Sequence, residues 1–165
     1  MTIETIKALL AYNKWANEQV LNCVKSAPAD VFKAEHDYSV GSLHQQVFHV
    51  MQSDWWAITS LTEGDMSQSP KIEDYDDFDS IMSKWQEIDA QYDEYIESLE
   101  SLDGSVTIQM QTPFEMPLFD FLMSGINHGT NHRAQILALL HKHGQETCEQ
   151  GYFFYTLARE KAATA

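Results

Sequence analysis

The chain has 165 residues, of which 44% are hydrophobic and 12% aromatic, a globular rather than a disordered composition. Its 25 acidic and 10 basic residues give a formal net charge of −15, which argues against nucleic acid and membrane surfaces as partners. Neither a long apolar run nor a secretory signal is evident, since the start "MTIETIKALLAYNKWANEQV" is amphipathic. We therefore expect a cytoplasmic protein with a single domain over residues 1–165.

Hydrophobic periodicity predicts four long helices, and the first two occupy the N-terminal part of the chain. The first runs from about Thr2 to Ser26, where "APAD" ends it. The second begins at Ser42, a suitable N-cap after Gly41, and continues through "LHQQVFHVMQSDWWAITSL". Gly64 and the acidic loop "EDYDDFD" separate it from the third.

The third helix has the most regular pattern, with apolar residues alternately four and three positions apart. This spacing is typical of helices packed at a shallow angle. The apolar positions are Ile81, Trp85, Ile88, Tyr92, Tyr95, Leu99 and Leu102.

The segment "DGSVTIQMQTPFEMP" then predicts a loop with a short extended or hairpin element, because "VTIQM" alternates apolar and polar residues. The fourth helix starts near Pro117 and ends at about His143, with Gly144 as its stop. A last short helix is expected at "YFFYTLARE". The fold class is therefore all-α, a four-helix bundle with a short extended excursion before the last long helix.

The fourth helix contains "GINHGTNHRAQILALLHKHG", in which His128 and His132 are four residues apart and share one face. Both fall on an arc with apolar residues, so we expect them at the bundle interior or its rim. Two histidines at this spacing are also common in proteins that bind no metal there, where they form ordinary hydrogen bonds. A metal site at His128 and His132 therefore requires a third ligand.

The second helix offers two candidates for this ligand, His44 and His49. The helical wheel places His44 among apolar residues and His49 beside polar ones, so periodicity alone favours His44. His141 and His143 lie in the last turn of the fourth helix, where we expect them to be solvated and to interact with the helix dipole.

Three segments together resemble a known family. They are "AYNKWANEQVL" in the first helix, "GSLHQQVFHVMQSDWW" in the second and "INHGTNHRAQI" in the fourth, and the resemblance spans residues 5 to about 145. The chain is similar to the DinB-like (DinB/YfiT) metalloprotein superfamily, which implies a four-helix bundle that binds a divalent ion through three histidines. Carried over by position, these are His49, His128 and His132, so the resemblance favours His49 where the wheel favours His44.

Three neutral imidazoles would leave an open coordination position, which is the pattern of a catalytic rather than a structural site. Zinc and nickel both suit imidazole donors. The resemblance implies a metal-dependent enzyme that activates a thiol or water for S-transfer or hydrolysis on a small molecule. It also implies a low-molecular-weight thiol as partner and a homodimer, while no catalytic residue can be assigned.

Two alternatives stay open at this point. One is a non-catalytic, metal-binding stress-response protein in which the ion is structural, and the other is a helical interaction module without metal. Whichever holds, nearby polar side chains should orient the imidazoles. The candidates are Asn127, Asn131, Gln135 and Asp54. Arg133 lies away from the ligand arc, and we expect it to form a structural ion pair.

Overall fold

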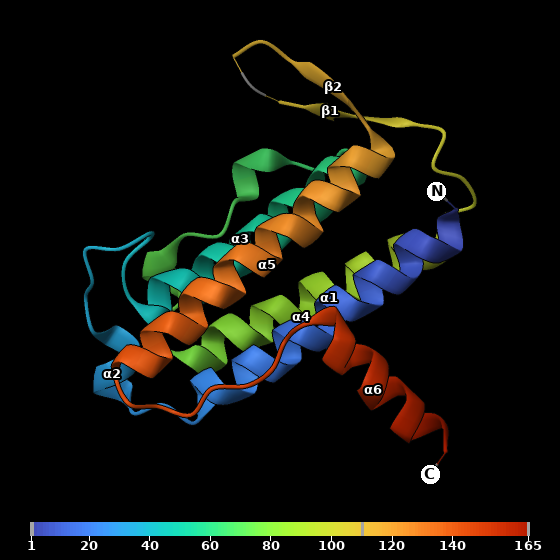
Figure 1. Ribbon diagram of the computed structural model, residues 1–165. Helices are drawn as coiled ribbons and strands as arrows, with labels where there is room; N and C mark the ends of the chain where they lie inside the picture. The colour runs from blue at the N-terminus through green and yellow to red at the C-terminus, as the bar shows by residue number, and fades with distance from the viewer. Residues whose placement is uncertain (1, 110, 165) are drawn as a thin grey trace.

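The structure is a computed structural model that describes residues 2–109 and 111–164. Its body consists of four long helices (Figure 1), which confirms the all-α bundle predicted from the sequence. They are α1 (Ile3–Lys25), α3 (Leu43–Leu61), α4 (Phe78–Ser98) and α5 (Leu118–Lys142). The shorter elements are α2 (Ala29–Lys33), η1 (Met66–Gln68), η2 (Ile72–Asp74), β1 (Ser105–Ile108), β2 (Phe114–Pro117) and α6 (Tyr152–Ala163).

The helices run in two directions. The first residues of α1 and α5 and the last residues of α3 and α4 pack at the same end of the bundle, beside the β1–β2 hairpin. The connection between α3 and α4, residues 62–77 with η1 and η2, therefore returns along the length of the bundle. The helix α3 packs against both α4 and α5, and α5 also packs against α1.

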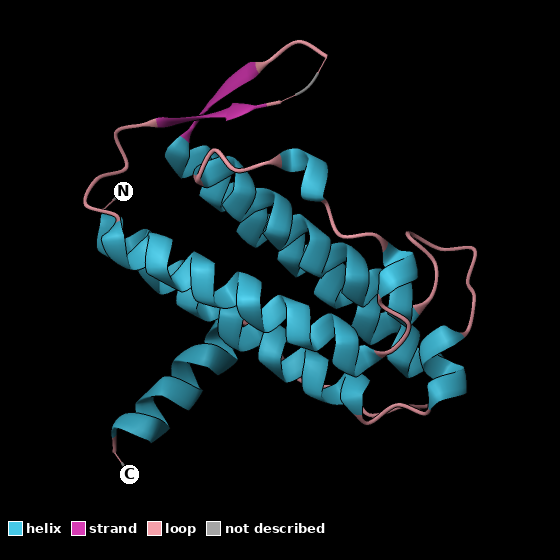
Figure 2. Ribbon diagram, turned by 180° about the vertical axis from the view of Figure 1, so that it is seen from behind, coloured by secondary structure: helices cyan, strands magenta, loops and turns pink. Residues whose placement is uncertain are grey.

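The predicted extended excursion is confirmed as the hairpin of β1 and β2 (Figure 2). The strands pair antiparallel, with Val106 opposite Met116 and Ile108 opposite Phe114. Val106 and Ile108 are buried and cover the start of α5. Met110, the last residue of the alternating segment, lies outside the described residues.

The helix ends follow local capping chemistry. Ser42 forms a capping box, since its Oγ accepts a hydrogen bond from the Gln45 backbone N–H and its own N–H donates to Gln45 Oε1. Gly41 precedes this cap with φ of +100°, and a Cβ there would collide with the Gln45 amide. The start predicted for α3 is therefore confirmed, with glycine required by the turn.

The predicted third helix extends too far. The helix α4 ends at Ser98, and Leu99 is already extended with ψ of 117°. Beyond it, Ser101 Oγ accepts the Asp103 backbone N–H and donates to the Asp103 carboxylate, a local turn that competes with helix continuation. Leu99 and Leu102 nevertheless pack against the core, which explains why they fit the apolar pattern. The short helix α2, which follows "AP", was not predicted.

The core has two apolar clusters, one at each end of the bundle. One contains Leu43, Met51, Ile81, Trp85 and Leu140, and the other contains Ile6, Val106, Phe121, Leu122 and Ile126. Among the described residues, none of the helices is both long and apolar enough to cross a bilayer.

Arg133 is buried in α5 with 1% of its surface exposed, and its partners differ from the predicted ion pair. Its Nη1 donates to Asn13 Oδ1 at 2.6 Å and to Asn17 Oδ1 at 2.7 Å, both on α1. Its Nε donates to Gln150 Oε1 at 2.7 Å, and its Nη2 to Thr130 Oγ1 at 3.0 Å. Neutral oxygens thus satisfy the guanidinium, and they tie α5 to α1 and to the segment before α6.

Two glycines on α5 test this network as a matched pair. A Cβ on Gly129 would lie 2.8 Å from Asn13 Oδ1 and 2.9 Å from Arg133 Nη1, whereas a Cβ on Gly125 would meet nothing within 4 Å. Gly125→Ala should raise the free energy of unfolding by about 0.5–1 kcal/mol, because alanine favours the helix. Gly129→Ala should lower it by about 1 kcal/mol or more, because the charged hydrogen bonds must shift. Urea unfolding measures both, and equal stabilities of the two variants would contradict the packing described.

Candidate metal centre

Three histidines from two helices meet between α3 and α5. The centroid of the His128 ring lies 4.4 Å from that of His132 and 5.2 Å from that of His49, and the His49 and His132 centroids are 4.5 Å apart. One ring nitrogen from each lies within 4.8 Å of the other two. The structure thus brings His49, rather than His44, to the pair on α5.

The spacing of these nitrogens fits a shared ion. His49 Nε2 and His128 Nε2 are 3.2 Å apart. Two imidazole nitrogens bound at about 2.0–2.1 Å to one tetrahedral zinc ion would be separated by about 3.3 Å. The donor set is therefore compatible with a divalent metal ion.

A chain of side-chain hydrogen bonds orients His132. Its Nδ1 lies 3.0 Å from Gln46 Oε1, and the Gln46 amide nitrogen donates to Gln135 Oε1 at 3.3 Å. Because the Gln46 oxygen can only accept, His132 carries its proton on Nδ1 and keeps the Nε2 lone pair for another partner. Ser39 donates to the same Gln135 oxygen and extends the chain.

All three imidazoles favour the neutral form that metal binding requires. Burial lowers the pKa of His49 and of His128, and the neighbouring His49 lowers that of His128 further. For His132, burial and the proximity of both other rings lower the pKa to about 4. The cluster is therefore uncharged at neutral pH.

His44, the ligand that periodicity alone favoured, has a structural role instead. Its Nε2 donates to the backbone oxygen of Tyr75 at 2.6 Å, and its ring packs edge-on against Phe32. The helical wheel correctly placed His44 toward the apolar interior, where it is buried. In this orientation its ring contacts Tyr75 and Phe32 and not the three-histidine cluster. Near the end of α5, His143 contacts His36 with the two Nε2 atoms 2.9 Å apart, so it is not simply solvated as predicted.

The residues predicted to orient the imidazoles lie in different places. Asn127 and Asn131 are exposed on α5. Asp54 accepts a hydrogen bond from Trp85 Nε1 at 2.9 Å, and Gln135 acts through Gln46. Sequence reasoning missed Gln46, although its position three residues before His49 placed it on the same helix face.

Comparison with known proteins identifies the family of this chain. The sequence model of the DinB family matches residues 1–161. The chain belongs to the DinB family. It is 26% identical over 171 residues to Protein DinB of Bacillus subtilis (strain 168), covering 93% of this chain and 96% of that protein.

Among solved structures, the chain resembles a DinB-like protein from Bacillus cereus ATCC 10987. The TM-score is 0.67 at 19% sequence identity, covering 90% of this chain and 97% of that chain. At this identity the likeness shows that the two proteins share the DinB-like fold.

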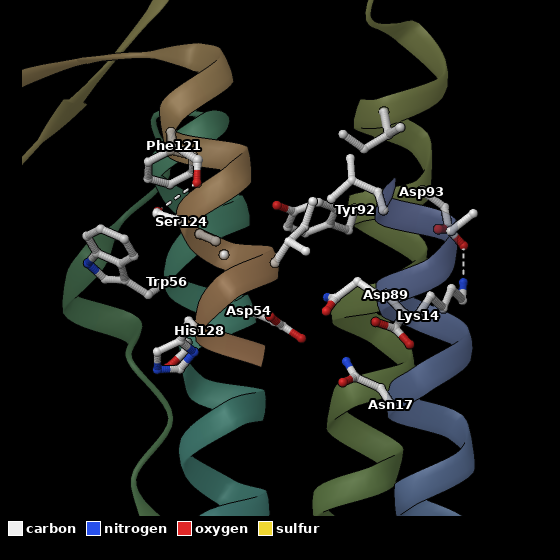
Figure 3. A pocket seen from close by; sticks show the side chains of 18 of the residues that line it. Lys14, Asn17, Asp54, Trp56, Asp89, Tyr92, Asp93, Phe121, Ser124 and His128 are labelled. Atoms are coloured by element: carbon white, nitrogen blue, oxygen red, sulfur yellow. Dashed lines mark hydrogen bonds and ion pairs between the residues drawn. The ribbon is translucent and has the colours of Figure 1, made fainter. Parts of the chain in front are cut away.

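The DinB-family bundle contains a cavity of about 920 Å³ beside the histidines. His128 lines it from α5, together with residues of α1, α3 and α4. In Figure 3 the side chains of His128 and Trp56 lie toward one side, while Asp54 and Asp89 point into the space between the helices. The volume is within the range of small-molecule sites, about 300–1,000 Å³.

Two carboxyl groups in this cavity have strongly raised pKa values. Burial, with a smaller contribution from Asp89, raises the pKa of Asp54 to about 7, although Trp85 and Arg133 oppose the rise. Burial raises the pKa of Asp89 to about 6, partly offset by Lys14. Both groups therefore resist ionisation more than an ordinary aspartate, whose pKa is about 3.9.

The raised pKa of Asp54 predicts how stability changes with pH. The unfolded chain releases this proton near pH 4, but the folded chain keeps it until about pH 7, so the free energy of unfolding falls as pH rises through this window. Asn at position 54 cannot ionise and can still accept from Trp85. The stability of Asp54→Asn relative to wild type should therefore rise between pH 4 and 7, by on the order of 1–3 kcal/mol.

Urea unfolding at several pH values measures this difference. Glu94→Gln, which removes an exposed carboxylate from α4, is the control and should differ from wild type by a constant amount. If the free energies of unfolding of Asp54→Asn and wild type changed with pH in parallel, the raised pKa of Asp54 would be contradicted.

Proposed function

We propose that this DinB-family protein binds a divalent ion, zinc or nickel, through His49, His128 and His132, and acts as a metal-dependent enzyme. In this proposal it activates a thiol or water for S-transfer or hydrolysis on a small molecule. The observation that carries the proposal is the convergence of three neutral imidazoles, one of which, His128, lines a cavity large enough for a small molecule. A three-histidine set leaves a coordination position for an incoming ligand, as catalytic zinc sites do.

The ion, when bound, supplies Lewis acidity that favours the deprotonated form of a thiol or water. The protein's own groups orient the site. Gln46 fixes the His132 ring with its Nε2 lone pair free, and Gln135 holds the Gln46 amide. His128 faces the cavity, so that a molecule bound there meets the histidine cluster at one end. We assign no side chain as general acid or base.

We infer a low-molecular-weight thiol as one substrate, a cytoplasmic location and a homodimer. The DinB-family match and the histidine cluster support the first inference. On α6, Phe153, Phe154 and Leu157 are exposed, and an apolar helix face of this kind supports self-association. The charge of −15 argues against nucleic acid as a partner.

Metal binding tests the ligand assignment directly. We expect the wild-type protein to bind one zinc or nickel ion per chain, because the three rings form one cluster. His128→Ala should weaken binding by about 100-fold or more, because it removes one of three donors. His141→Ala, which removes an exposed histidine from the same helix, should bind as wild type does. Competition titration with a chelating indicator measures the affinities, and equal affinity of the two variants would exclude His128 as a ligand.

Thiol consumption against a panel of electrophiles tests the enzymatic role. We expect the metal-loaded wild type to consume thiol faster than His128→Ala, because the ion favours the thiolate. Equal rates would remove the metal from the mechanism.

Chelation distinguishes a catalytic from a structural ion. A catalytic ion should be removable with loss of activity and only a modest change in melting temperature, since α3 and α5 already pack through apolar residues. Cooperative unfolding on chelation would instead support a structural ion.

A further inference from the structure

The cavity beside the histidines has two chemically different ends. At one end, His128, Trp56 and Phe121 line the same side of the cavity (Figure 3), and the centroids of the Trp56 and Phe121 rings lie 5.8 Å apart. At the other, Asp54 of α3 and Asp89 of α4 point into the space between the helices. Apolar side chains line the cavity as well, among them Leu10, Ala57 and Ile126. A ligand that fills this cavity therefore has an apolar middle and meets acidic groups at the end away from His128.

The cations near this acidic end already have other partners. Lys14 forms an ion pair with Asp93 at 2.5 Å, and Lys7 donates to the backbone oxygen of Glu97 at 3.4 Å. Lys14 lies near enough to Asp89 to lower its pKa in part, but the effect of burial is larger.

Arg133 also leaves the carboxylates available. Its hydrogen bonds go to neutral oxygens, including Asn13 Oδ1 and Asn17 Oδ1, and its charge only partly offsets the effect of burial on Asp54. These asparagine oxygens carry no charge, and each already accepts one hydrogen bond from the guanidinium, so they offer a cation less than a carboxylate does.

Asp93 and Glu97 line the cavity too, but Asp93 is paired with Lys14. Asp54 and Asp89 are the carboxyl groups there whose pKa burial raises strongly.

A positively charged group between the two aspartates would stabilise both in their ionised form. Burial raises both pKa values, which indicates that the charges of Lys14 and Arg133 do not fully compensate these carboxylates. An ammonium group provides three hydrogen-bond donors and one positive charge, and hydrogen bonds between charged groups are stronger than neutral ones.

We propose that the cavity binds a small molecule with an ammonium group, held between Asp54 and Asp89, while the other end of the molecule reaches His128. The substrate class is therefore an amine with an apolar middle section. The inference rests on the proposed function in one respect, namely that the end at His128 is the reacting end.

Binding of matched thiols tests this inference. Isothermal titration calorimetry of the zinc-loaded protein compares 6-amino-1-hexanethiol with 6-mercapto-1-hexanol, which has a hydroxyl in place of the ammonium. At about 0.15 M salt, which screens the overall charge of the protein, the amine should bind about tenfold more tightly or better. Asp54→Asn and Asp89→Asn should each remove most of this preference and leave the affinity of the alcohol unchanged. The unchanged affinity also shows that the variants are folded.

Glu94→Gln is the matched control, because it removes one negative charge from the exposed face of α4. It should keep the full preference for the amine. Equal affinity of the two thiols for the wild type would overturn the inference, as would a preference that survives both aspartate substitutions or the absence of binding by either thiol.

A second arm separates this inference from the proposed function. Hexylamine and 1-hexanol are titrated into the chelator-treated protein, where thiol–metal contact plays no part. Preference for hexylamine that depends on Asp54 supports the amine site even if thiol consumption proves independent of metal. Conversely, metal-dependent thiol consumption without any preference for amines would retain the proposed function and overturn the amine site.

Discussion

The approach of His49 to His128 across the α3–α5 interface is the constraint on which the candidate site depends. The two Nε2 atoms are 3.2 Å apart, so the helices must be fixed in both rotation and translation. A shift of one residue in either helix would turn an imidazole by about 100° and separate the nitrogens. The buried contacts of Leu43, Val47 and Met51 on α3 with Ile136 and Leu140 on α5 belong to one core cluster, which holds this register.

Polar residues inside the bundle add hydrogen bonds between helices to the contacts that apolar side chains make. Gln46 links α3 to His132, and Arg133 links α5 to α1 through two asparagine oxygens. Gln46 contacts His132 directly, and Arg133 follows His132 on α5. Both make hydrogen bonds to neutral partners. Buried polar groups that are fully paired favour one arrangement of the helices over its neighbours. The cavity lined by α1, α3, α4 and α5 is therefore a defined feature of the fold, with a histidine at one end and carboxyl groups at the other.

Much of this architecture follows from local patterns in the sequence. The capping box at Ser42 and the four-residue spacing of His128 and His132 follow from rules that act within one helix. The choice of His49 over His44 does not, because both lie on α3 and only packing against α5 decides which ring meets the pair. Family resemblance supplied that choice. The partners of Arg133 and the role of Gln46 also depend on contacts between segments far apart in the chain, which periodicity cannot show.

X-ray absorption spectroscopy at the metal edge of the zinc- or nickel-loaded protein tests the central claim most directly. Three imidazole ligands at one ion, with one more position occupied by an exchangeable small ligand, are the expected result. The imidazole number should fall to two in His49→Ala. A coordination shell with fewer than three imidazoles in the wild type, or one that His49→Ala leaves unchanged, would contradict the claim that α3 and α5 together form the metal centre.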